Sequence, residues 1–210
     1  MELYWGSGSP YAWRVMLGLM FKGMPYEDHL LSFGEREHKS AHYTRLNPRG
    51  RVPTLVDGEV VVRESLAILA YLDRVYPRKL LFGGSPADAA RIWQTVMELE
   101  NIVTPAAQTV IGALFFQRWQ GREAELKELR DTVFEELDLL ERDFEEGPWN
   151  AIDCMLVPLI ASLERASRKQ GAEKLGLLPL NLGRWPRLRA RYLAIAELPG
   201  FERTWPPHWR

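Results

Sequence analysis

Apolar and polar residues alternate in short runs in the first third of the chain. Two β-type runs, Thr54–Asp57 and Glu59–Val62, flank an Asp57–Gly58 pair. An Asp-Gly pair between apolar runs favours a type I′ hairpin, because both central residues tolerate positive φ. A helical pattern follows at once, with its apolar residues on one face at Leu66, Leu69, Leu72 and Val75. The sequence therefore predicts a hairpin that runs directly into a helix.

The same pattern predicts three earlier elements. Strands are expected at Leu3–Gly6 and Tyr26–Ser32, with a helix between them that ends at the C-cap residue Gly23. The polar segment Glu35–Arg45 is typical of a loop with a short helix. The predicted order over residues 1–76 is therefore β-α-β-α-β-β-α.

From residue 85 onwards the pattern is helical throughout. Ser85, Pro86 and Asp88 combine an N-cap serine, a proline at the first helical position and an acid two residues later. Apolar residues then recur at helical spacing along two long helices, and Asn150–Asp153 caps a third. A last helix is expected near Trp185–Pro186, followed by a tryptophan-rich tail. We expect an α/β domain at 1–76, a linker at 77–87 and an all-helical domain at 88–210.

Composition narrows the function classes. The chain of 210 residues is 46% hydrophobic and carries a formal net charge of −1, which argues against bulk binding to nucleic acid or anionic membranes. Cys154 is the single cysteine, so an intrachain disulfide and a multi-cysteine metal site are excluded. No apolar run approaches the ~20 residues of a membrane span, and Met1–Trp5 lacks the pattern of a signal peptide. We therefore expect a cytoplasmic protein without a metal.

Val52–Pro53 before the hairpin and Glu64–Ser65 at the following helix start resemble the glutathione-binding half of the glutathione transferase superfamily. The resemblance covers nearly the whole chain and includes the Asn150–Asp153 box, where family members usually have Ser or Thr instead of Asn150. It implies a thioredoxin-like domain over residues 1–76, a C-terminal helical bundle, glutathione as co-substrate and a homodimer.

The resemblance also assigns roles to these residues. In the family, the residue before a cis-proline pairs through its backbone with the cysteinyl unit of glutathione, which implies this role for Val52 before Pro53. The acidic-Ser pair receives the γ-glutamyl end, here Glu64 and Ser65. A helix start suits an anion, because its first N–H groups lack partners and the helix dipole is positive there. The alternative is an ordinary capped helix, since Ser is a common N-cap.

Three basic residues are candidates for the other end of glutathione. Glu37–Lys39 resembles the segment that contacts the glycine carboxylate in one serine class, so His38 would supply a hydrogen bond and Lys39 a charge. The alternative is a solvated helix face. Arg51 departs from many relatives, which have Gln before Val-Pro, but arginine can also reach a carboxylate through a charge-assisted bond.

Ser9–Ala12 lies where a thioredoxin carries Cys-x-x-Cys, and sulfur is absent from it. The run SPYAWRV resembles the serine-type classes, in particular the plant-type and the isomerase-type. In those classes the serine six residues before the valine assists the glutathione thiol, which implies that role for Ser9. A hydroxyl that donates to sulfur at a helix start stabilises the thiolate. Ser7 is the nearby competitor, and the alternative role of Ser9 is a plain N-cap.

The second substrate is expected between the two domains, a usual place for small-molecule clefts. The predicted walls are Tyr11, Phe33, Gln108, Ile111, Phe115 and Phe116, with Trp205 or Trp209 folding back from the tail. An aromatic stripe at helical spacing is also typical of a core. The histidines His29, His42 and His208 are assigned to packing or to the surface.

We therefore expect a glutathione transferase of the detoxifying kind, in which the thiolate of glutathione attacks a small apolar electrophile. One alternative is glutathione-dependent cis–trans isomerisation of the maleylacetoacetate type, in which the thiolate adds and leaves again; peroxidase activity also stays open. Another alternative is a non-catalytic module that uses the same fold for binding or dimerisation.

Overall fold

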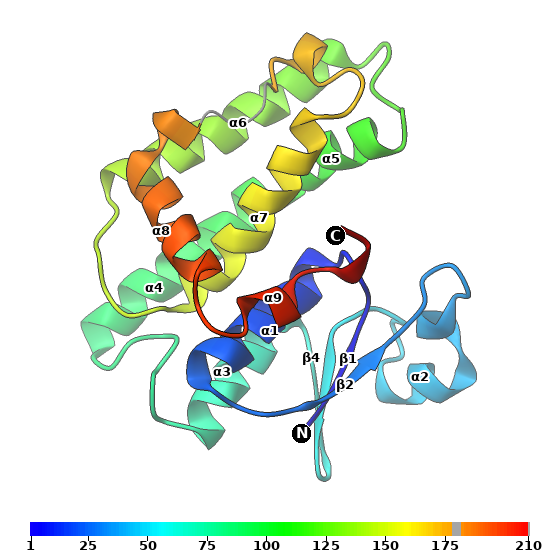
Figure 1. Cartoon of the computed structure of the whole chain (residues 1–210), viewed down its shortest axis with the longest axis vertical. Helices are drawn as coiled ribbons and strands as arrows, with labels where there is room; N and C mark the ends of the chain where they lie inside the picture. The colour runs from blue at the N-terminus through cyan, green and yellow to red at the C-terminus, as the bar shows by residue number, and fades with distance from the viewer. Residues whose placement is uncertain (178–181, 210) are drawn as a thin grey trace. The chain divides into compact units, whose positions relative to one another are not determined.

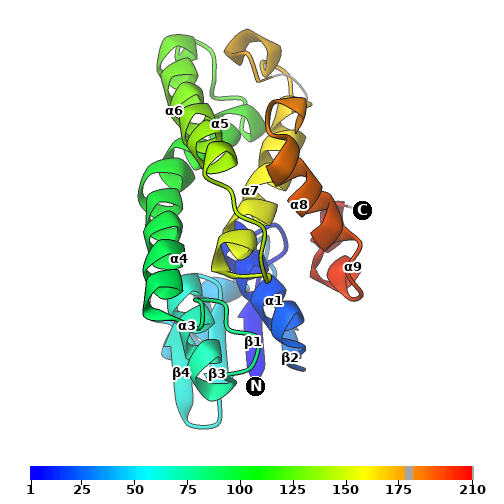
Figure 2. The ribbon, with the colours of Figure 1, turned by 90° about the vertical axis from the view of Figure 1, so that its left-hand side faces the viewer.

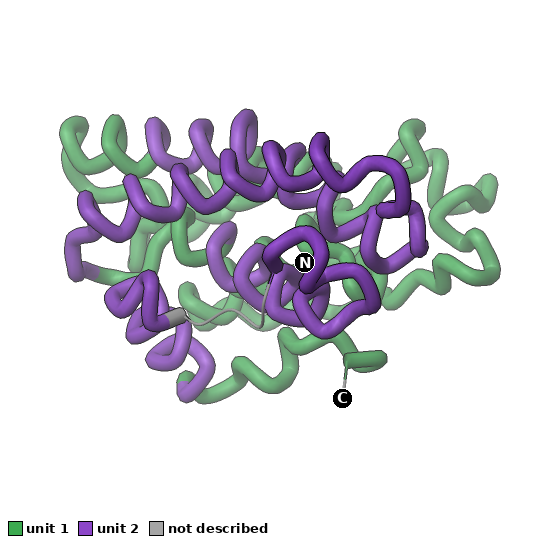
Figure 3. Tube along the Cα trace, turned by 90° about the horizontal axis from the view of Figure 1, so that it is seen from above, with its two compact units in different colours: residues 1–92, 148–154, 198–210 green, residues 93–147, 155–197 purple. Residues whose placement is uncertain are grey.

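The computed structural model describes residues 1–177 and 182–209. Contacts group the chain into two units (Figure 3). The first unit combines residues 1–92 with residues 148–154 and 198–210, and the second combines residues 93–147 with 155–197. These ranges differ from the expected boundaries, because the expected linker 77–87 and the tail both cluster with the N-terminal residues.

The first unit contains a mixed sheet of four strands in the order β2-β1-β3-β4. The strands are β1 (Glu2–Trp5), β2 (Glu27–Leu30), β3 (Thr54–Asp57) and β4 (Val60–Arg63). β1 runs parallel to β2 and antiparallel to β3, and β3 runs antiparallel to β4. With the helices between them, these strands form the predicted thioredoxin-like order.

The hairpin between β3 and β4 differs from the prediction by one residue. Asp57 pairs with Val60, so the turn consists of Gly58 and Glu59 rather than Asp57 and Gly58. Of the two turn residues only Gly58 has a positive φ, at 58°. This is the pattern of a type II′ turn, which requires glycine only at its first central position. The prediction of a type I′ turn is therefore wrong.

Three helices and a short 3₁₀ turn complete the thioredoxin-like part. They are α1 (Pro10–Lys22), η1 (Glu37–Lys39), α2 (Ala41–Leu46) and α3 (Ser65–Val75). Figure 1 shows α1 and α3 on one side of the sheet and α2 on the other. Gly23 ends α1 with φ 67°, as predicted. The core between α1, α3 and the sheet includes Leu3, Leu17, Leu55 and Leu69, all fully buried.

The remaining described elements are mostly helical, as predicted. They are α4 (Pro86–Glu98), η2 (Leu99–Val103), α5 (Thr104–Phe115), α6 (Glu123–Arg142), α7 (Ala151–Ser167), η3 (Glu173–Leu175), η4 (Leu182–Arg184), α8 (Pro186–Ala196), α9 (Phe201–Thr204) and η5 (Pro207–Trp209). Within the second unit α5 and α6 lie side by side (Figures 1 and 2). Among the described helices, none is long and apolar enough to cross a membrane.

The predicted helix starts are confirmed by their capping bonds. The Asp88 N–H donates to Ser85 Oγ over 3.1 Å, and the Asn150 N–H donates to Asp153 Oδ2 over 2.8 Å. The predicted long helix after residue 85 contains a π-type segment at Leu99–Val103. Pro105 has no N–H to continue the α-pattern there, and the Thr104 N–H bonds Leu99 O instead.

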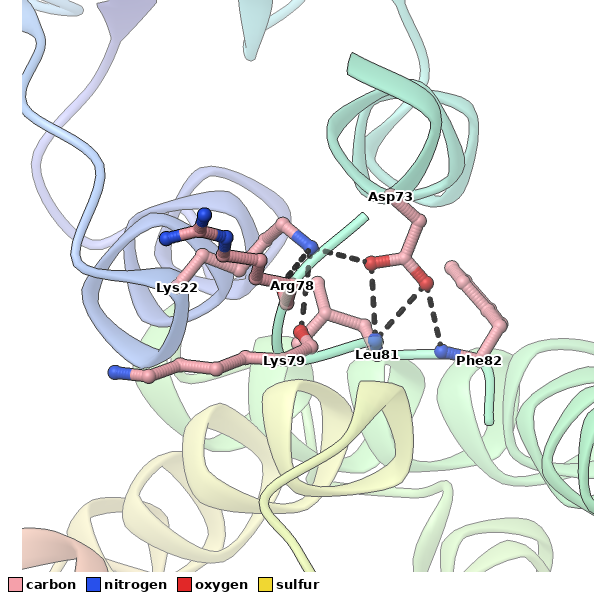
Figure 4. A network of polar contacts seen from close by, with 6 residues as sticks. All are labelled: Lys22, Asp73, Arg78, Lys79, Leu81 and Phe82. Atoms are coloured by element: carbon pink, nitrogen blue, oxygen red, sulfur yellow. Dashed lines mark hydrogen bonds and ion pairs between the residues drawn. The ribbon is translucent and has the colours of Figure 1, made fainter. Parts of the chain in front are cut away.

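A buried ion pair ties the expected linker to the first unit (Figure 4). Lys22 Nζ lies 2.7 Å from Asp73 Oδ1, with side-chain exposures of 0% and 9%. Lys22 also donates to the carbonyls of Arg78 and Lys79. The Asp73 carboxylate accepts the N–H groups of Leu81 and Phe82, each over 2.9 Å. These bonds join the chain after α3 to both α1 and α3.

Lys22→Met should destabilise the protein strongly. The substitution leaves the Asp73 carboxylate buried without its counter-ion, so we expect the free energy of unfolding to fall by about 3–5 kcal/mol. Urea denaturation measures the change. Arg91→Met is the matched control, because it breaks an ion pair with Asp88 that is exposed to solvent and should leave the midpoint unchanged. A Lys22→Met midpoint equal to that of the wild type would contradict the prediction.

Candidate active site

The strand register brings the expected glutathione-binding segments to one end of the sheet. Thr54, at the start of β3, pairs with Tyr4 on β1 and with Arg63 on β4. Both pairings are antiparallel, so β1 and β4 end where β3 begins. The residues that follow β1, precede β3 and follow β4 are Ser7–Ser9, Val52–Pro53 and Glu64–Ser65.

The residues after β2 reach the same end, because Trp5 pairs with Leu30 in parallel. Phe33 packs there against Gly6: a Cβ added to Gly6 would lie only 2.3 Å from the Phe33 ring. The Phe33 ring also meets the His38 ring edge-on, with centroids 5.1 Å apart. Phe33 therefore connects the loop after β1 to His38.

Hydrogen bonds from the side chains of Tyr43 and Asn47 hold the backbone just before β3. The Val52–Pro53 peptide bond is cis, as the sequence suggests. The Tyr43 hydroxyl and the Asn47 amide both donate to the Arg51 carbonyl and contact Thr54 Oγ1. Among the described residues, none hydrogen-bonds to the backbone of Val52. Its N–H and C=O therefore form a short free edge beside β3.

Glu64 adopts a backbone conformation that residues other than glycine seldom take, with φ 67° and ψ 121°. It occupies the N-cap position of α3, but its side chain makes no capping bond. The first helical bond runs from the Ile68 N–H to the Glu64 carbonyl. Ser65 is the first residue of the helix, so the alternative in which it acts as the N-cap is wrong. Within residues 1–177 and 182–209, no side chain caps the first N–H groups of α3, so these groups are available to a ligand.

Ser9 is the N-cap of α1: its Oγ accepts the Ala12 N–H over 3.2 Å. A hydroxyl can accept one hydrogen bond and donate another. Because no described residue accepts its proton, Ser9 can cap the helix and still donate to a ligand. The competitor Ser7 is differently placed, with its Oγ 2.6 Å from His208 Nδ1.

Lys39 joins two of the expected binding segments. Its ammonium donates to the carbonyls of Arg49, over 3.1 Å, and of Gly50, over 2.7 Å. This places η1 against the residues before Val52. The Arg51 guanidinium is exposed and makes no hydrogen bond or ion pair within the part of the chain that the structure describes. Both groups add positive charge to this end of the sheet.

The expected electrophile-site residues divide between the two units. In the first unit, Trp205 packs edge-on against Trp13 at 5.2 Å, and Tyr11 lies under the Arg14 guanidinium at 4.6 Å. On α5, Gln108, Ile111 and Phe115 follow a spacing that places them on one helix face, and Phe116 is 70% exposed. The grouping of these residues into one electrophile site stays a prediction.

The contact between His208 and Ser7 is one that the sequence does not reveal. His208 is exposed, in line with its assignment above, and its ring bonds to Ser7, which lies 201 residues earlier. No local pattern connects such distant positions. Cys154 is buried, and burial raises the pKa of its thiol well above the usual value.

Comparisons with known proteins decide the family. Residues 8–75 match the family described as "Glutathione S-transferase, N-terminal domain". The chain is 32% identical to "Glutathione S-transferase A" of Pleuronectes platessa, over 100% of this chain and 92% of that protein. This chain belongs to the glutathione S-transferase family. The expectation of a glutathione transferase, an enzyme rather than a non-catalytic module, is thereby confirmed.

Two further relatives bear on the fold and the chemistry. The crystal structure of a glutathione S-transferase from the Antarctic clam Laternula elliptica superposes with a TM-score of 0.81 at 31% identity, covering 99% of this transferase and 93% of that chain. This confirms the thioredoxin-like domain and the helical C-terminal region. The "Maleylacetoacetate isomerase" of Pseudomonas aeruginosa is 28% identical over 98% of this chain and 96% of that protein.

The protonation of His38 tests its place in the site. Burial, and then the charges of Lys39 and Arg36, lower the pKa of His38 below its usual 6.5. The folded protein therefore binds fewer protons here than the unfolded chain, so this group reduces stability as the pH falls below about 6.5. A glutathione carboxylate beside the ring should raise this pKa, and glutathione affinity should in turn increase as the pH falls through that window.

NMR titration of the histidine ring, with and without glutathione, measures this shift. The exposed His42 on α2 is the internal reference and should not respond to the ligand. A complex in which the His38 titration is unchanged would remove His38 from the contact with the glycine carboxylate.

Proposed function

We propose that this transferase binds glutathione at the end of the sheet where β1, β3 and β4 meet and conjugates its thiolate to a small apolar electrophile. The observation that carries the proposal is the strand register. The register brings three groups to one end of the sheet. They are the Ser9 hydroxyl at the start of α1, the backbone of Val52 and the start of α3 after Glu64, which no side chain caps. Each group matches one part of glutathione.

The tripeptide would lie across these groups in a definite direction. The Val52 backbone pairs with the cysteinyl unit, as a short strand added at a free edge. The γ-glutamyl end carries an amine and a carboxylate, which suit the Glu64 carboxylate and the open N–H groups from Ser65 onwards. The glycine carboxylate then faces the positive groups Lys39 and Arg51 and the ring of His38, which would supply a hydrogen bond. The buried Pro53 supports the bend without contributing a donor.

The chemistry depends on the ionisation of the bound thiol. A thiolate, not a thiol, is the nucleophile. Ser9 donates its hydroxyl proton to the sulfur at the positive end of α1, which lowers the thiol pKa and maintains the anion. The sulfur lone pair then forms a bond to the electrophilic carbon, and the electron pair of the broken bond leaves with the displaced group.

A second candidate is glutathione-dependent isomerisation, which the likeness to a maleylacetoacetate isomerase favours. In that reaction the same thiolate adds to a double bond and leaves again, so glutathione is recovered unchanged. Measuring glutathione consumption against product distinguishes the two reactions. The homodimer and the cytoplasmic location stay predictions; a mass measurement in solution decides the first.

Ser9→Ala tests the proposed function directly. Removing the hydroxyl should diminish the ultraviolet thiolate absorbance of the glutathione complex near neutral pH. The conjugation rate should fall by roughly one to three powers of ten, the scale for loss of a donor to an anion. The loss should lie in kcat rather than in glutathione affinity.

Because Ser9 also caps α1, its loss weakens the helix by about 1 kcal/mol. Ser85→Ala is the matched control, since it removes the N-cap of α4 without touching the site. A thiolate signal that persists in Ser9→Ala would remove this role from Ser9. A wild type that forms no thiolate would overturn the proposed function itself.

Glu64→Ala tests the γ-glutamyl contact. Loss of a charge-assisted bond should weaken glutathione binding by about 1.5–3 kcal/mol, measured by calorimetry. The fold should persist, because the Glu64 side chain makes no capping bond and is exposed. Glu59→Ala, in the turn of the same hairpin, is the charge-matched control and should bind as the wild type does. Equal affinities of all three proteins would contradict the assignment.

A further inference from the structure

The C-terminal tail lies against the loop that carries the two serines. The tail is anchored to α1, because the Trp13 indole N–H donates to Thr204 Oγ1 over 2.9 Å and the Trp209 ring meets the Trp13 ring edge-on. Gly8, at φ 82°, lies under the tail, and a Cβ there would approach His208 Cε1 to 2.7 Å. The bare backbone of Gly8 thus lets His208 reach Ser7.

The hydrogen bonds of His208 determine where its proton is. The Trp209 indole N–H donates to His208 Nε2 over 3.0 Å. Indole is only a donor, so Nε2 must present its lone pair, and the neutral imidazole carries its proton on Nδ1. Nδ1 lies 2.6 Å from Ser7 Oγ. His208 is therefore the donor and Ser7 the acceptor in that bond.

This direction fixes the role of the Ser7 hydroxyl. With one lone pair of Oγ engaged by His208, the hydroxyl proton is directed elsewhere, and no described residue accepts it. His208 cannot act as a base toward Ser7, because its Nδ1 is already protonated. A nucleophilic serine of the Ser-His kind is thus excluded in this arrangement, and the remaining function of the hydroxyl is donation.

The ligand for that donor follows from its position. Ser7 and Ser9 belong to one loop, at the sheet end beside Val52 and Glu64. We propose that Ser7 is a second hydrogen-bond donor to the sulfur of glutathione, and that His208 is the positioning residue that aims it. This inference rests on the proposed function. It makes the tail a part of the thiolate site, in addition to its packing against Trp13.

Substitutions at His208 distinguish its proposed role in orienting the Ser7 hydroxyl from a role in holding the tail in place. His208→Leu removes the donor and should lower kcat with a chlorodinitrobenzene electrophile about tenfold, less than the loss of a donor itself. It should also raise the thiol pKa of bound glutathione, read from the thiolate absorbance. His208→Asn should restore both readouts to within about threefold of the wild type, because its amide nitrogen is attached at the same carbon position as Nδ1. Glutathione affinity should change little in either variant.

Thr204→Val is the control for the anchoring role. It removes the bond from Trp13 that holds the tail and does not touch Ser7. Its stability should fall, while its thiolate absorbance should match that of the wild type. If Thr204→Val loses the thiolate signal as strongly as His208→Leu does, the tail has a structural role only and the inference is overturned.

A double-mutant cycle completes the test. Ser7→Ala should lower kcat at least as much as His208→Leu, and adding His208→Leu to Ser7→Ala should cause no further loss, because His208 acts through Ser7. Full additivity, or an unchanged rate in Ser7→Ala, would overturn the inference even where the wild type forms the thiolate. Absence of the thiolate from the wild type would instead overturn the proposed function, so the two failures are distinguishable.

Discussion

The Lys22 ammonium and the Asp73 carboxylate meet near the C-terminal ends of α1 and α3, where almost no water reaches them. Burying such charges is costly unless each has further partners, and here two carbonyls and two N–H groups of the following segment supply them. The pair fixes the two helices to one another. Gly18 brings them close, since a Cβ there would lie 2.3 Å from Leu69 Cδ2. The N-terminal ends of the same two helices lie at the candidate site, so the pair holds together the two helices that supply its helix starts.

Those two helix starts give the site its electrostatic character. Ser9 satisfies one N–H of α1 and keeps a proton to donate, whereas the first turn of α3 is left without a capping side chain. Glu64 has a strained backbone at the junction between β4 and α3, and such strain is common at ligand-binding positions. Lys39 and Arg51 add positive charge at the same end of the sheet, which agrees with the proposed binding of a peptide that has two carboxylates.

The C-terminal tail packs against the thioredoxin-like unit, although the helical part precedes it in sequence. Residues 198–210 follow the helical part in sequence but cluster with the thioredoxin-like unit, because Trp205 and Trp209 both pack edge-on against Trp13 of α1. Such aromatic contacts gain apolar burial and favourable ring geometry at the same time. The result is that a residue near the end of the chain, His208, reaches a loop near its beginning.

Sequence alone determined the features that depend on neighbouring residues. The cap residues Gly23, Ser85 and Asn150 and the strand–helix order of the first unit follow from local rules of backbone conformation, and the structure has them where expected. Tertiary structure alone decided the features that need a distant partner. The Lys22–Asp73 pair and the bond from His208 to Ser7 join segments whose contact no local pattern specifies. Their geometry depends on how distant segments pack together. A linear pattern of apolar and polar residues does not specify which of those residues meet.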